Sequence, residues 1–578
     1  MNSEKFLKHP VRHYIWKYRG PFALGLFFLL ITNALDAVYP LIMKKAIDQI
    51  AAGEALSAIA MTSLLFFAVM AGLALTRYCW RVFFGRYHTA AAEDLRNRFF
   101  NHLTDLGPNF FHRHQIGELM SLITNDVQAF RAGIGSGLLI LFDGVSIIFL
   151  VIPLMLYLEP TWTWKTLIFL PAVPFLIWLV TKLTFKAFKK QQDDLSDLAA
   201  FTQEIVSGIR VIKGFHQEDN KVKFYNHISD RYEKSSNHVA LIDAFFPPIM
   251  RFGVASGTVI LLFIAGPDII GGVATIGTLV AFQRYISKMV WPMTALGYGL
   301  SQYQKGLASF DRIKKILEEQ TDIPNTGTHR GQEFQSLRVE NLTFSYPETE
   351  APTLKNLSFE IHKGDFVGVI GTVGAGKTTL LQILSRLYPV SHGRVLYNGI
   401  PIEQWDTTSL RQLVATVPQE PFLFSESIAE NVLLGRQDET DPSVVEQYTE
   451  IVDLKEELES LPQKYNSQLG ERGVNLSGGQ KQRLALARGL ALSAPVLLLD
   501  DVLSAVDTKT EKKIEVALNQ RTTQQTKLIV THRLSVVAKA NMLIVINNGE
   551  IEAIGSHQEL AKISPTYQKM AEIQEFSV

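Results

Sequence analysis

The chain has 578 residues, which is too long for one hydrophobic core and indicates two or three domains. Basic and acidic residues number 56 each, so the bulk charge gives no sign of a nucleic-acid-binding protein. A composition with 47% hydrophobic and only 19% charged residues indicates a membrane protein. The single cysteine, Cys79, excludes an internal disulfide and a cysteine-based metal site.

Residues 1–22 interleave basic residues with Phe6, Tyr14 and Trp16. This alternation favours a short helix lying on the cytoplasmic membrane surface, although an ordinary juxtamembrane segment would have nearly the same composition. No small-residue cleavage site follows the next apolar run, so we expect the segment to remain on the chain.

Six apolar stretches then follow, each long enough to cross a bilayer, which takes about 20 helical residues. The predicted spans lie at about 21–44, 57–80, 134–158, 163–185, 245–266 and 276–302. The last is interrupted by Arg284 and Lys288. The gaps after the second and fourth spans are long, have a helical pattern and hold many basic residues, whereas the other gaps are short. Because cytoplasmic loops carry the excess of lysine and arginine, we expect both long gaps and both termini in the cytoplasm.

A polar connector at residues 321–332 separates two regions of different character. We predict a transmembrane domain over residues 1–320. Residues 333–578 alternate short β-rich runs with helical patterns, which predicts an α/β domain with a largely parallel sheet.

The second region contains a phosphate-binding loop, with Gly371, Gly376, Lys377 and Thr378 at the required spacing between a strand-like and a helical run. The glycines allow backbone N–H groups to surround phosphates, the lysine adds charge, and the threonine hydroxyl can ligate Mg²⁺. The predicted ATP-binding residues of this loop are Gly371, Thr372, Val373, Gly374, Ala375, Gly376, Lys377, Thr378 and Thr379. Farther on, the apolar run "APVLLLDD" predicts a buried strand that delivers Asp500 to the magnesium ion through water.

A second phosphate-gripping motif precedes another helix, at Leu476, Ser477, Gly478, Gly479 and Gln480. Because the first loop already holds the phosphates of one nucleotide, the second motif predicts a second nucleotide that is shared with a partner chain.

With these motifs the chain resembles an ABC exporter subunit in which six transmembrane helices are fused to one ATPase domain. The resemblance implies an all-α membrane domain with long cytoplasmic helical extensions, followed by an α/β P-loop ATPase domain. It also implies roles for single residues: Tyr346 stacks on adenine, Gln419 touches Mg²⁺, and His532 contacts the γ-phosphate. Ser504 and Asp507 belong to a loop that crosses the dimer interface. Segments at about 109–126 and 208–220 are similar to the coupling segments that dock on the ATPase domains.

Asp501 departs from the pattern of this family, which predicts a glutamate that acts as general base or holds the attacking water. Aspartate is one methylene shorter, and a misplacement of about 1 Å can cost about a hundredfold in rate. Under one interpretation the chain pairs with a different subunit that bears the glutamate, as in heterodimeric bacterial multidrug exporters. Under the other, a homodimeric exporter or lipid flippase uses Asp501 itself. A weakly hydrolysing, ATP-gated regulatory or channel-like membrane protein is a third possibility.

The substrate is not encoded in any motif, but Asn33, Asp36, Asp143 and Arg284 place polar groups within predicted spans. Such groups usually face a cavity or a partner helix. Asn33 and Asp36 share one helix face, which we predict to contribute to the substrate path; hydrogen bonding between helices is the alternative. The remaining expectations are ATP and Mg²⁺ as cofactors, an amphipathic substrate, no nucleic acid, and a multi-pass position in the plasma (inner) membrane with the ATPase domain in the cytoplasm.

Overall fold

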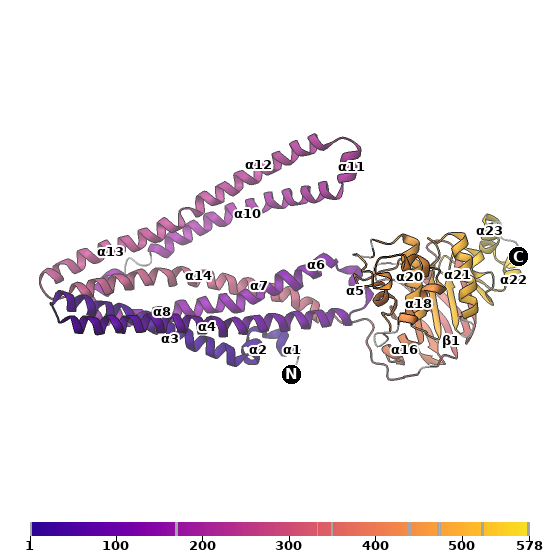
Figure 1. Cartoon of the computed structure of the whole chain (residues 1–578), viewed down its shortest axis with the longest axis horizontal. Coiled ribbons are helices and arrows are strands. Elements are labelled where there is room, and N and C mark those ends of the chain that lie inside the picture. Colours follow the sequence, from indigo (N-terminus) through magenta and orange to yellow (C-terminus); the bar gives the residue numbers. More distant parts are fainter. Residues whose placement is uncertain are drawn as a thin grey trace. The chain divides into compact units, whose positions relative to one another are not determined.

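The computed structural model describes residues 3–167, 172–331, 333–347, 349, 351–436, 442–470, 473, 475–521 and 525–574. Two compact units make up the chain (Figure 1), and each is described by itself. The helical unit comprises Met1–Thr104 and Gly117–Glu319, and the α/β unit comprises Asp105–Ile116 and Gln320–Val578. The predicted fold class, a helical domain followed by an α/β domain, is confirmed.

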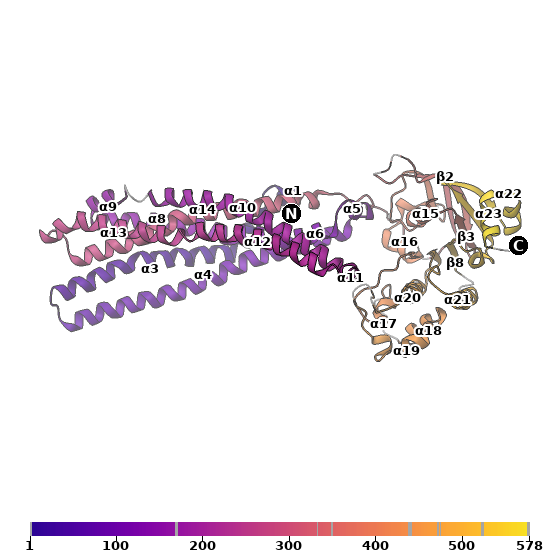
Figure 2. The ribbon, with the colours of Figure 1, turned by 90° about the horizontal axis from the view of Figure 1, so that it is seen from above.

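Long helices dominate the helical unit (Figures 1 and 2). In chain order they are α1 (Ser3–Lys8), α2 (Pro10–Lys17), α3 (Arg19–Ala51), α4 (Leu56–Asp105), α6 (Ile116–Ser121), α7 (Val127–Ala132), α8 (Leu138–Leu158), α9 (Pro160–Leu167), α10 (Ala172–Ser207), α11 (Ile209–Gly214), α12 (Glu218–Asp243), α13 (Phe246–Ile270) and α14 (Ile276–Glu318). Two π-helical turns, Leu122–Asp126 and Gly133–Gly137, connect α6, α7 and α8 into one continuous helical stretch.

Four helical stretches among the described residues are long and apolar enough to cross a membrane: Arg19–Ala51, Leu56–Asp105, Ile116–Leu158 and Glu218–Ile270. They contain the first, second, third and fifth predicted spans. Residues 168–171 of the fourth span lie outside the described residues, and α14 carries the charges Arg284 and Lys288 within the sixth. The count of six membrane crossings therefore stays a prediction.

Helix α14 is the central packing element of this unit, because it packs along α3, α7, α8 and α13. Two glycines permit its closest approach: a Cβ atom on Gly133 would lie 2.8 Å from the Cα atom of Gly306. The buried Tyr285 hydroxyl of α14 donates a hydrogen bond of 2.7 Å to the Ala37 carbonyl of α3. Helices α10 and α12 pack on each other as an antiparallel pair (Figure 1).

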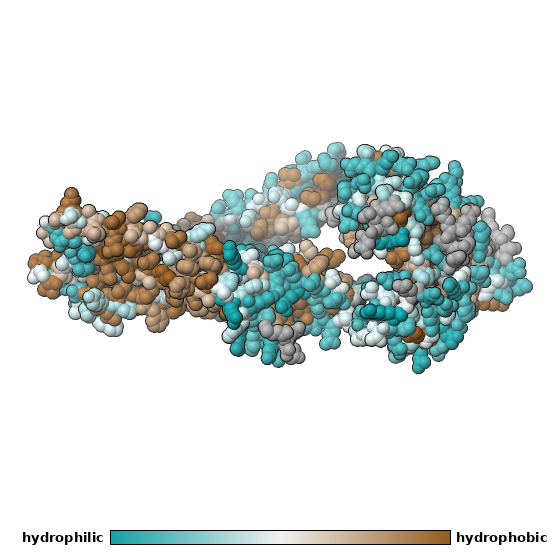
Figure 3. All heavy atoms as spheres, turned by 60° about the horizontal axis from the view of Figure 1, so that its bottom comes forward, coloured by the Kyte–Doolittle hydropathy of each residue, from teal (hydrophilic) through white to brown (hydrophobic). Residues whose placement is uncertain are grey.

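Apolar side chains cover the surface of the helical unit where α3, α4, α8 and α13 run together, and hydrophilic side chains gather toward α1 and α2 (Figure 3). Leu64, Phe67, Phe149 and Phe263 are among the exposed large apolar residues of this surface. Water penalises such exposure and lipid does not, so the surface is suited to a bilayer.

The α/β unit contains ten described strands in two sheets. They are β1 (Ser336–Phe344), β2 (Leu354–His362), β3 (Phe366–Gly371), β4 (His392–Tyr397), β5 (Ile400–Pro401), β6 (Val414–Val417), β7 (Val496–Asp500), β8 (Thr526–Val530), β9 (Met542–Asn547) and β10 (Glu550–Gly555). The antiparallel sheet has the order β2-β1-β4-β5. The larger sheet has the order β10-β9-β3-β8-β7-β6 and is parallel except for β10.

Helices cover both faces of the parallel sheet. After residue 320 the helices of this unit are α15 (Lys377–Leu384), α16 (Thr407–Leu413), α17 (Ile428–Val432), α18 (Pro442–Ile451), α19 (Lys455–Glu459), α20 (Gly478–Ala491), α21 (Thr508–Arg521), α22 (His557–Ile563) and α23 (Pro565–Ile573). Of these, α15, α16, α20 and α23 pack on strands of the parallel sheet, whereas α17 and α18 pack on α20. Strands β3, β7 and β8 are buried along their whole length, as expected of parallel strands that are covered on both faces. Because parallel strands end at the same edge, Gly371, Asp500 and Thr531 meet there, and this edge is the usual ligand position in such sheets.

A short segment between α4 and α6 belongs to the α/β unit. It contains α5 (Pro108–Arg113), where His112 Nε2 lies 2.9 Å from the Tyr388 hydroxyl and Asn109 donates a hydrogen bond to Asp322. Of the predicted coupling segment 109–126, only the part up to residue 116 lies in this unit. The other predicted coupling segment, 208–220, contains α11, which has no buried residue.

Candidate functional site

The phosphate-binding loop joins the buried end of β3 to α15, and its glycines are required by the backbone. Gly371 has φ +151°, and a Cβ atom there would lie only 1.9 Å from the Ile546 carbonyl oxygen. Gly376, with φ +92°, occupies the position before the first residue of α15. Backbone N–H groups at the start of a helix have no partner within the helix and attract anions. The loop is therefore built to bind phosphate.

Lys377 is the first residue of α15 and is almost completely buried. Its ammonium donates hydrogen bonds of 3.0 Å to the Gly371 carbonyl and 2.8 Å to the Thr372 carbonyl. Burial lowers the pKa of Lys377, and the nearby carboxylates Asp500 and Asp501 oppose that shift. The cation thus lies at the centre of the loop, where the anionic phosphates of a nucleotide would offset the cost of its burial.

Asp500 ends β7 beside this loop, and the Thr378 side chain hydrogen-bonds its carboxylate. Burial raises the pKa of Asp500, while Thr378 and Lys377 act in the opposite direction. Magnesium takes oxygen ligands, often one or two carboxylates together with substrate phosphates. The hydroxyl of Thr378, the carboxylate of Asp500 and the side-chain oxygen of Gln419 form an oxygen donor set that fits this ion.

The raised pKa of Asp500 predicts a pH-dependent cost in the absence of ligand. The pKa of Asp500 in the folded chain lies above the unfolded value of 3.8, so folding stability falls as pH rises above 3.8, and the cost is larger at pH 7 than at pH 4. We expect Asp500→Asn, with EDTA and without nucleotide, to unfold at a higher temperature than the native chain at pH 7. The gain should shrink toward pH 4 in thermal unfolding scans of the detergent-purified chain.

Asp507 provides the control for this experiment. A backbone hydrogen bond from Thr510 lowers the pKa of Asp507, so its contribution to stability has the opposite sign. The substitution Asp507→Asn should give no gain at pH 7. An equal gain for Asp500→Asn at pH 4 and pH 7 would contradict the explanation through ionisation.

Asp501, the next residue, has a left-handed backbone with φ +45°, a conformation that aspartate tolerates better than most residues. Its amide donates a hydrogen bond of 2.8 Å to the Val530 carbonyl, which fixes the turn at the sheet edge. Its carboxylate accepts a long hydrogen bond of 3.4 Å from Gln419 Nε2 and another of 3.4 Å from the Thr531 hydroxyl. The sheet edge thus brings the predicted Gln419 and Asp501 together.

The other predicted residues of the nucleotide site lie around the same edge. The Tyr346 hydroxyl is 2.9 Å from the Thr379 hydroxyl, so the ring lies beside α15. His532 follows β8 and lies close enough to Asp500 to influence its pKa electrostatically. Val373 of the loop is 88% exposed, which leaves the entrance to the loop open.

The second phosphate-gripping motif forms the start of α20. The Ser477 side chain accepts a hydrogen bond from the Gln480 amide, and the Gln480 side chain accepts one of 2.8 Å from the Ser477 amide. This reciprocal arrangement is a capping box. Ser477 and Gly478 are exposed, and a Cβ atom added to Gly478 would meet nothing within 4 Å. The motif is therefore preformed and accessible.

One glutamine joins this motif to the loop after Asp501. Gln482 of α20 donates a hydrogen bond of 2.9 Å to the Ser504 hydroxyl and accepts one of 2.9 Å from the Ala505 amide. The Ser504 hydroxyl in turn donates a hydrogen bond of 2.9 Å to the Asp501 carbonyl. Asp507 accepts hydrogen bonds from the first turn of α21. The predicted interface residues Ser504 and Asp507 thus lie in one hydrogen-bonded loop.

Comparisons with known proteins agree with this arrangement. Residues 22–293 match the family described as ABC transporter transmembrane region, and residues 354–504 match the family described as ABC transporter. The probable multidrug resistance ABC transporter ATP-binding/permease protein YheI of Bacillus subtilis (strain 168) is 34% identical over 96% of this chain and 95% of its own length. The chain belongs to the ABC transporter family.

Two further relatives of this ABC transporter cover nearly its whole length. The multidrug resistance-like ATP-binding protein MdlA of Escherichia coli (strain K12) is 34% identical over 97% of this chain and 94% of its own. The ATP-dependent lipid A-core flippase of Pasteurella multocida (strain Pm70) is 31% identical over 97% of both chains. The chain is therefore a multi-pass membrane transporter whose transport is driven by an ATPase domain.

A solved structure agrees on the fold. A bacterial Atm1-family ABC exporter with ATP bound has a TM-score of 0.78 and 24% sequence identity. The similarity covers 96% of this chain and 98% of the exporter.

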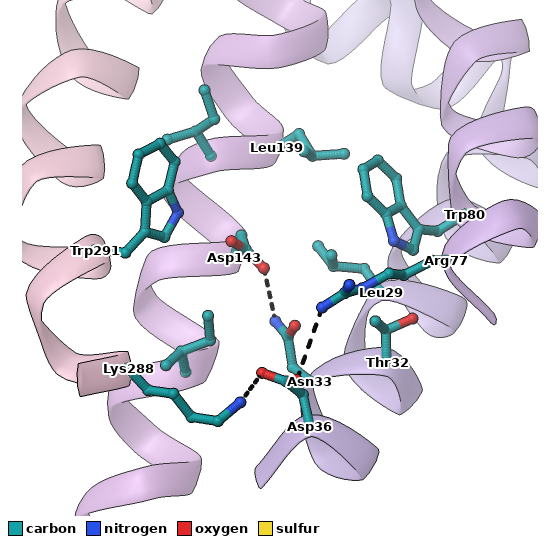
Figure 4. A pocket seen from close by; sticks show the side chains of 12 residues that line it. Leu29, Thr32, Asn33, Asp36, Arg77, Trp80, Leu139, Asp143, Lys288 and Trp291 are labelled. Atoms are coloured by element: carbon teal, nitrogen blue, oxygen red, sulfur yellow. Dashed lines mark hydrogen bonds and ion pairs between the residues drawn. The ribbon is translucent and has the colours of Figure 1, made fainter. Parts of the chain in front are cut away.

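The polar face of α3 in this ABC transporter lines a cavity of about 380 Å³ among α3, α4, α8 and α14 (Figure 4). Asn33 donates hydrogen bonds of 2.9 Å to Asp143 and 2.6 Å to Ser146, and Asp36 forms an ion pair with Lys288. Asn33 thus lines a cavity and also hydrogen-bonds to a neighbouring helix. Its role in a substrate path stays a prediction.

Sequence reasoning missed four residues of these sites: Thr531, Gln482, Arg77 and Lys288. Thr531 and Gln482 contact residues that are distant in sequence. Only the place of Thr531 beside His532, and of Gln482 two residues after the motif of α20, could have drawn attention to them. In the sequence Lys288 stands out only as an interruption of an apolar run. Its partner Asp36 lies 252 positions away, so the pairing has no local signal.

Proposed function

We propose that this ABC transporter is one half of a dimeric exporter that moves amphipathic small molecules, drug-like or lipid-like, across the membrane by alternating access. The observation that carries the proposal is one phosphate-binding loop and one partner-facing motif, fused to a helical unit that holds a cavity with charged lining residues. The relatives described above, one named a probable multidrug resistance transporter, one a multidrug resistance-like protein and one a lipid A-core flippase, support the same class of substrate.

We infer that ATP binds to the loop of α15 as the Mg²⁺ complex. Lys377 holds the phosphates, Thr378 and Gln419 supply oxygen ligands, and Asp500 acts through water. His532 contacts the γ-phosphate, and Tyr346 stacks on the adenine. The ion neutralises charge on the phosphates when bound.

The partner is proposed to be a different half-transporter that has glutamate at the position of Asp501. The motif at Ser477 and Gly478 is preformed and exposed, so it can serve the site of a partner. The acid of the chain's own site, Asp501, is one methylene shorter than the expected glutamate. Under this proposal the chain retains ATP at its own site and completes the site of the partner. A homodimer, exporter or lipid flippase, with a working Asp501 is the second candidate, and the hydrogen bonds that hold Asp501 in the site favour it.

A dimer also accounts for the exposed apolar residues of α11, the short helix between α10 and α12. Ile209 and Val211 of this helix and Phe215 after it are exposed, although they are apolar. We infer that this predicted coupling segment docks on the ATPase unit of the second half-transporter and that the segment at α5 docks on the chain's own. Closure of the ATPase units would then move both helix pairs. We place the chain in the plasma (inner) membrane, with the termini and the ATPase unit in the cytoplasm.

Transport assays test the proposal directly. Inverted membrane vesicles that contain the chain together with its partner subunit, or the Asp501→Glu chain, should accumulate an amphipathic dye such as Hoechst 33342 when ATP is added, and candidate drugs should stimulate ATP turnover. An ATP-gated regulatory or channel-like protein would bind ATP but give no concentrative uptake. That outcome would overturn the exporter proposal.

The substitution Gly478→Asp tests the partner-facing motif. Gly478 has open space around it, so the fold should be intact, but a carboxylate there would repel the phosphates of the shared nucleotide. We expect ATP turnover of the active transporter, or of the Asp501→Glu chain, to fall by about tenfold or more, which corresponds to about 1.4 kcal/mol. The control Gly478→Ala should retain most turnover, and nucleotide binding at the chain's own loop should be unchanged in both variants. Equal turnover in the aspartate and alanine variants would contradict a phosphate contact here.

A further inference from the structure

The cavity in the helical unit presents two unsatisfied groups of opposite kind (Figure 4). Its charged lining residues are Asp36, Arg77, Asp143 and Lys288, two acids and two bases. They are not paired one to one, because both bases contact the same acid. Lys288 forms a close ion pair with Asp36, and Arg77 NH2 lies 3.7 Å from the other oxygen of Asp36. Asp36 and Lys288 neutralise each other in this close ion pair. Arg77 and Asp143 form no comparably close ion pair among the described residues.

The side of the cavity formed by α4 offers hydrogen-bond donors. The Arg77 side chain is 50% exposed, and its 3.7 Å contact is longer than a hydrogen bond. The indole N–H of Trp80 is buried and has no acceptor among the residues that the structure describes. Arg81 already lies 5.5 Å from the centre of the Trp80 ring, so the N–H is the group left unsatisfied. A buried donor without an acceptor is costly, which favours a ligand that brings one.

The side formed by α8 offers an anion. Asp143 accepts a hydrogen bond of 2.9 Å from the Asn33 amide, but within the described part of the chain no cation forms an ion pair with it. A neutral amide satisfies one lone pair of a carboxylate, and Arg77 acts on Asp143 electrostatically without a hydrogen bond or ion pair between them, so the carboxylate can take a further cationic partner. The apolar part of the wall is formed by Leu29, Leu139, Ile140 and Ile147, and Trp291 stands across the cavity from Trp80 (Figure 4).

We propose that this cavity binds zwitterionic amphiphiles, with the cationic group of the ligand at Asp143 and its anionic group at Arg77 and the Trp80 N–H. The inference rests on the proposed export function and names the substrate class of the same transporter. The apolar body of the ligand packs between Trp291 and the leucine and isoleucine side chains. A purely cationic ligand leaves the donors of α4 unsatisfied, and a purely anionic ligand leaves Asp143 uncompensated. A ligand with both charges satisfies both sides and keeps the lining electrically balanced.

Matched probes with one alkyl chain test this proposal by calorimetric titration of the full chain in the non-ionic detergent dodecyl maltoside. Octylphosphocholine is the zwitterion, octyltrimethylammonium the cation and octyl phosphate the anion. We expect the zwitterion to bind about tenfold more tightly than either singly charged probe. Norfloxacin, a planar zwitterion without a lipid-like chain, distinguishes a drug-like ligand from a lipid head group as the source of the charges.

Two substitutions assign the two ends of the ligand. Asp143→Asn should reduce octylphosphocholine binding to the level of octyl phosphate, and Arg77→Gln should reduce it to the level of octyltrimethylammonium. Glu159→Gln, at the residue that follows α8, and Arg86→Gln, on α4, both lie outside the cavity and should retain the preference for the zwitterion. Thermal unfolding of each variant identifies any that fail to fold.

The outcomes are distinct. Equal binding of the cation and the zwitterion would overturn the proposal in favour of organic cations, and equal binding of the anion and the zwitterion would overturn it in favour of anions. Absence of binding for all probes, together with ATP-driven dye uptake into vesicles, would refute this inference and leave the export function intact. Absence of both would refute both.

Discussion

Replacement of Asp501 by glutamate is expected to raise ATP turnover of the purified chain in lipid by about a hundredfold, from a nearly silent starting level. The native carboxylate is held by Gln419 and Thr531, each at 3.4 Å. The additional methylene of glutamate would carry the carboxylate beyond these contacts toward the attacking water. Asp501→Asn is the matched control, because it removes the charge without lengthening the side chain. Its ATP turnover should stay at the low level of the native chain.

Either result of this measurement decides the composition of the transporter. If only the glutamate variant hydrolyses ATP rapidly, the native site is degenerate and a glutamate-bearing partner has to be sought among half-transporters of the same membrane. If the native chain turns over at about ten per minute or faster and glutamate adds little, Asp501 is a working acid. The heterodimer proposal would then be wrong.

Lys377→Ala is expected to weaken ATP binding at the chain's own site by about 10- to 100-fold. A hydrogen bond to a charged group contributes about 1.5–3 kcal/mol, and each 1.4 kcal/mol is tenfold in affinity. The nucleotide-free chain should not lose stability through this change, because burial lowers the pKa of Lys377 and its removal relieves the cost of a buried cation. Fluorescence titration with trinitrophenyl-ATP and magnesium measures the loss.

Lys363→Ala, which changes an exposed lysine of the same unit, is the control and should leave the affinity within twofold. In the Asp501→Glu background, Lys377→Ala should also abolish the gain in turnover. Affinity for ATP that stays unchanged in Lys377→Ala would contradict the role of this lysine and would place nucleotide binding elsewhere.

The two predictions address different parts of one sheet edge. The first concerns how fast nucleotide is hydrolysed, through Asp501, and the second concerns how tightly it is bound, through Lys377. Gln482 connects Asp501 to the motif that faces the partner, since it bonds the loop after Asp501 through Ser504 and Ala505. A nucleotide bound against that motif therefore lies two hydrogen bonds from the turn that positions Asp501.

The nucleotide site could be predicted almost entirely from the sequence. The loop from Gly371 to Thr379 and the motif from Leu476 to Gln480 are contiguous, and each is formed by a local structure, a strand-to-helix turn or a helix cap. Asp500 could be placed because a buried parallel strand delivers its last residue to the ligand edge. The division into a helical and an α/β unit was also predictable, because hydrophobic patterning changes between them.

Only the tertiary structure decided which distant side chains meet. Thr531 and Gln482 reach the surroundings of Asp501 through strand order and helix packing. In the membrane half, the amino acid sequence established only that polar groups such as Asn33 and Asp36 occur within apolar helices. The pairing of Asp36 with Lys288, and the hydrogen bond that joins Asp143 to Asn33, depend on how α3, α8 and α14 pack. Local sequence determines each helix and its caps, whereas contacts between helices depend on packing along whole surfaces, which has no short signal in the chain.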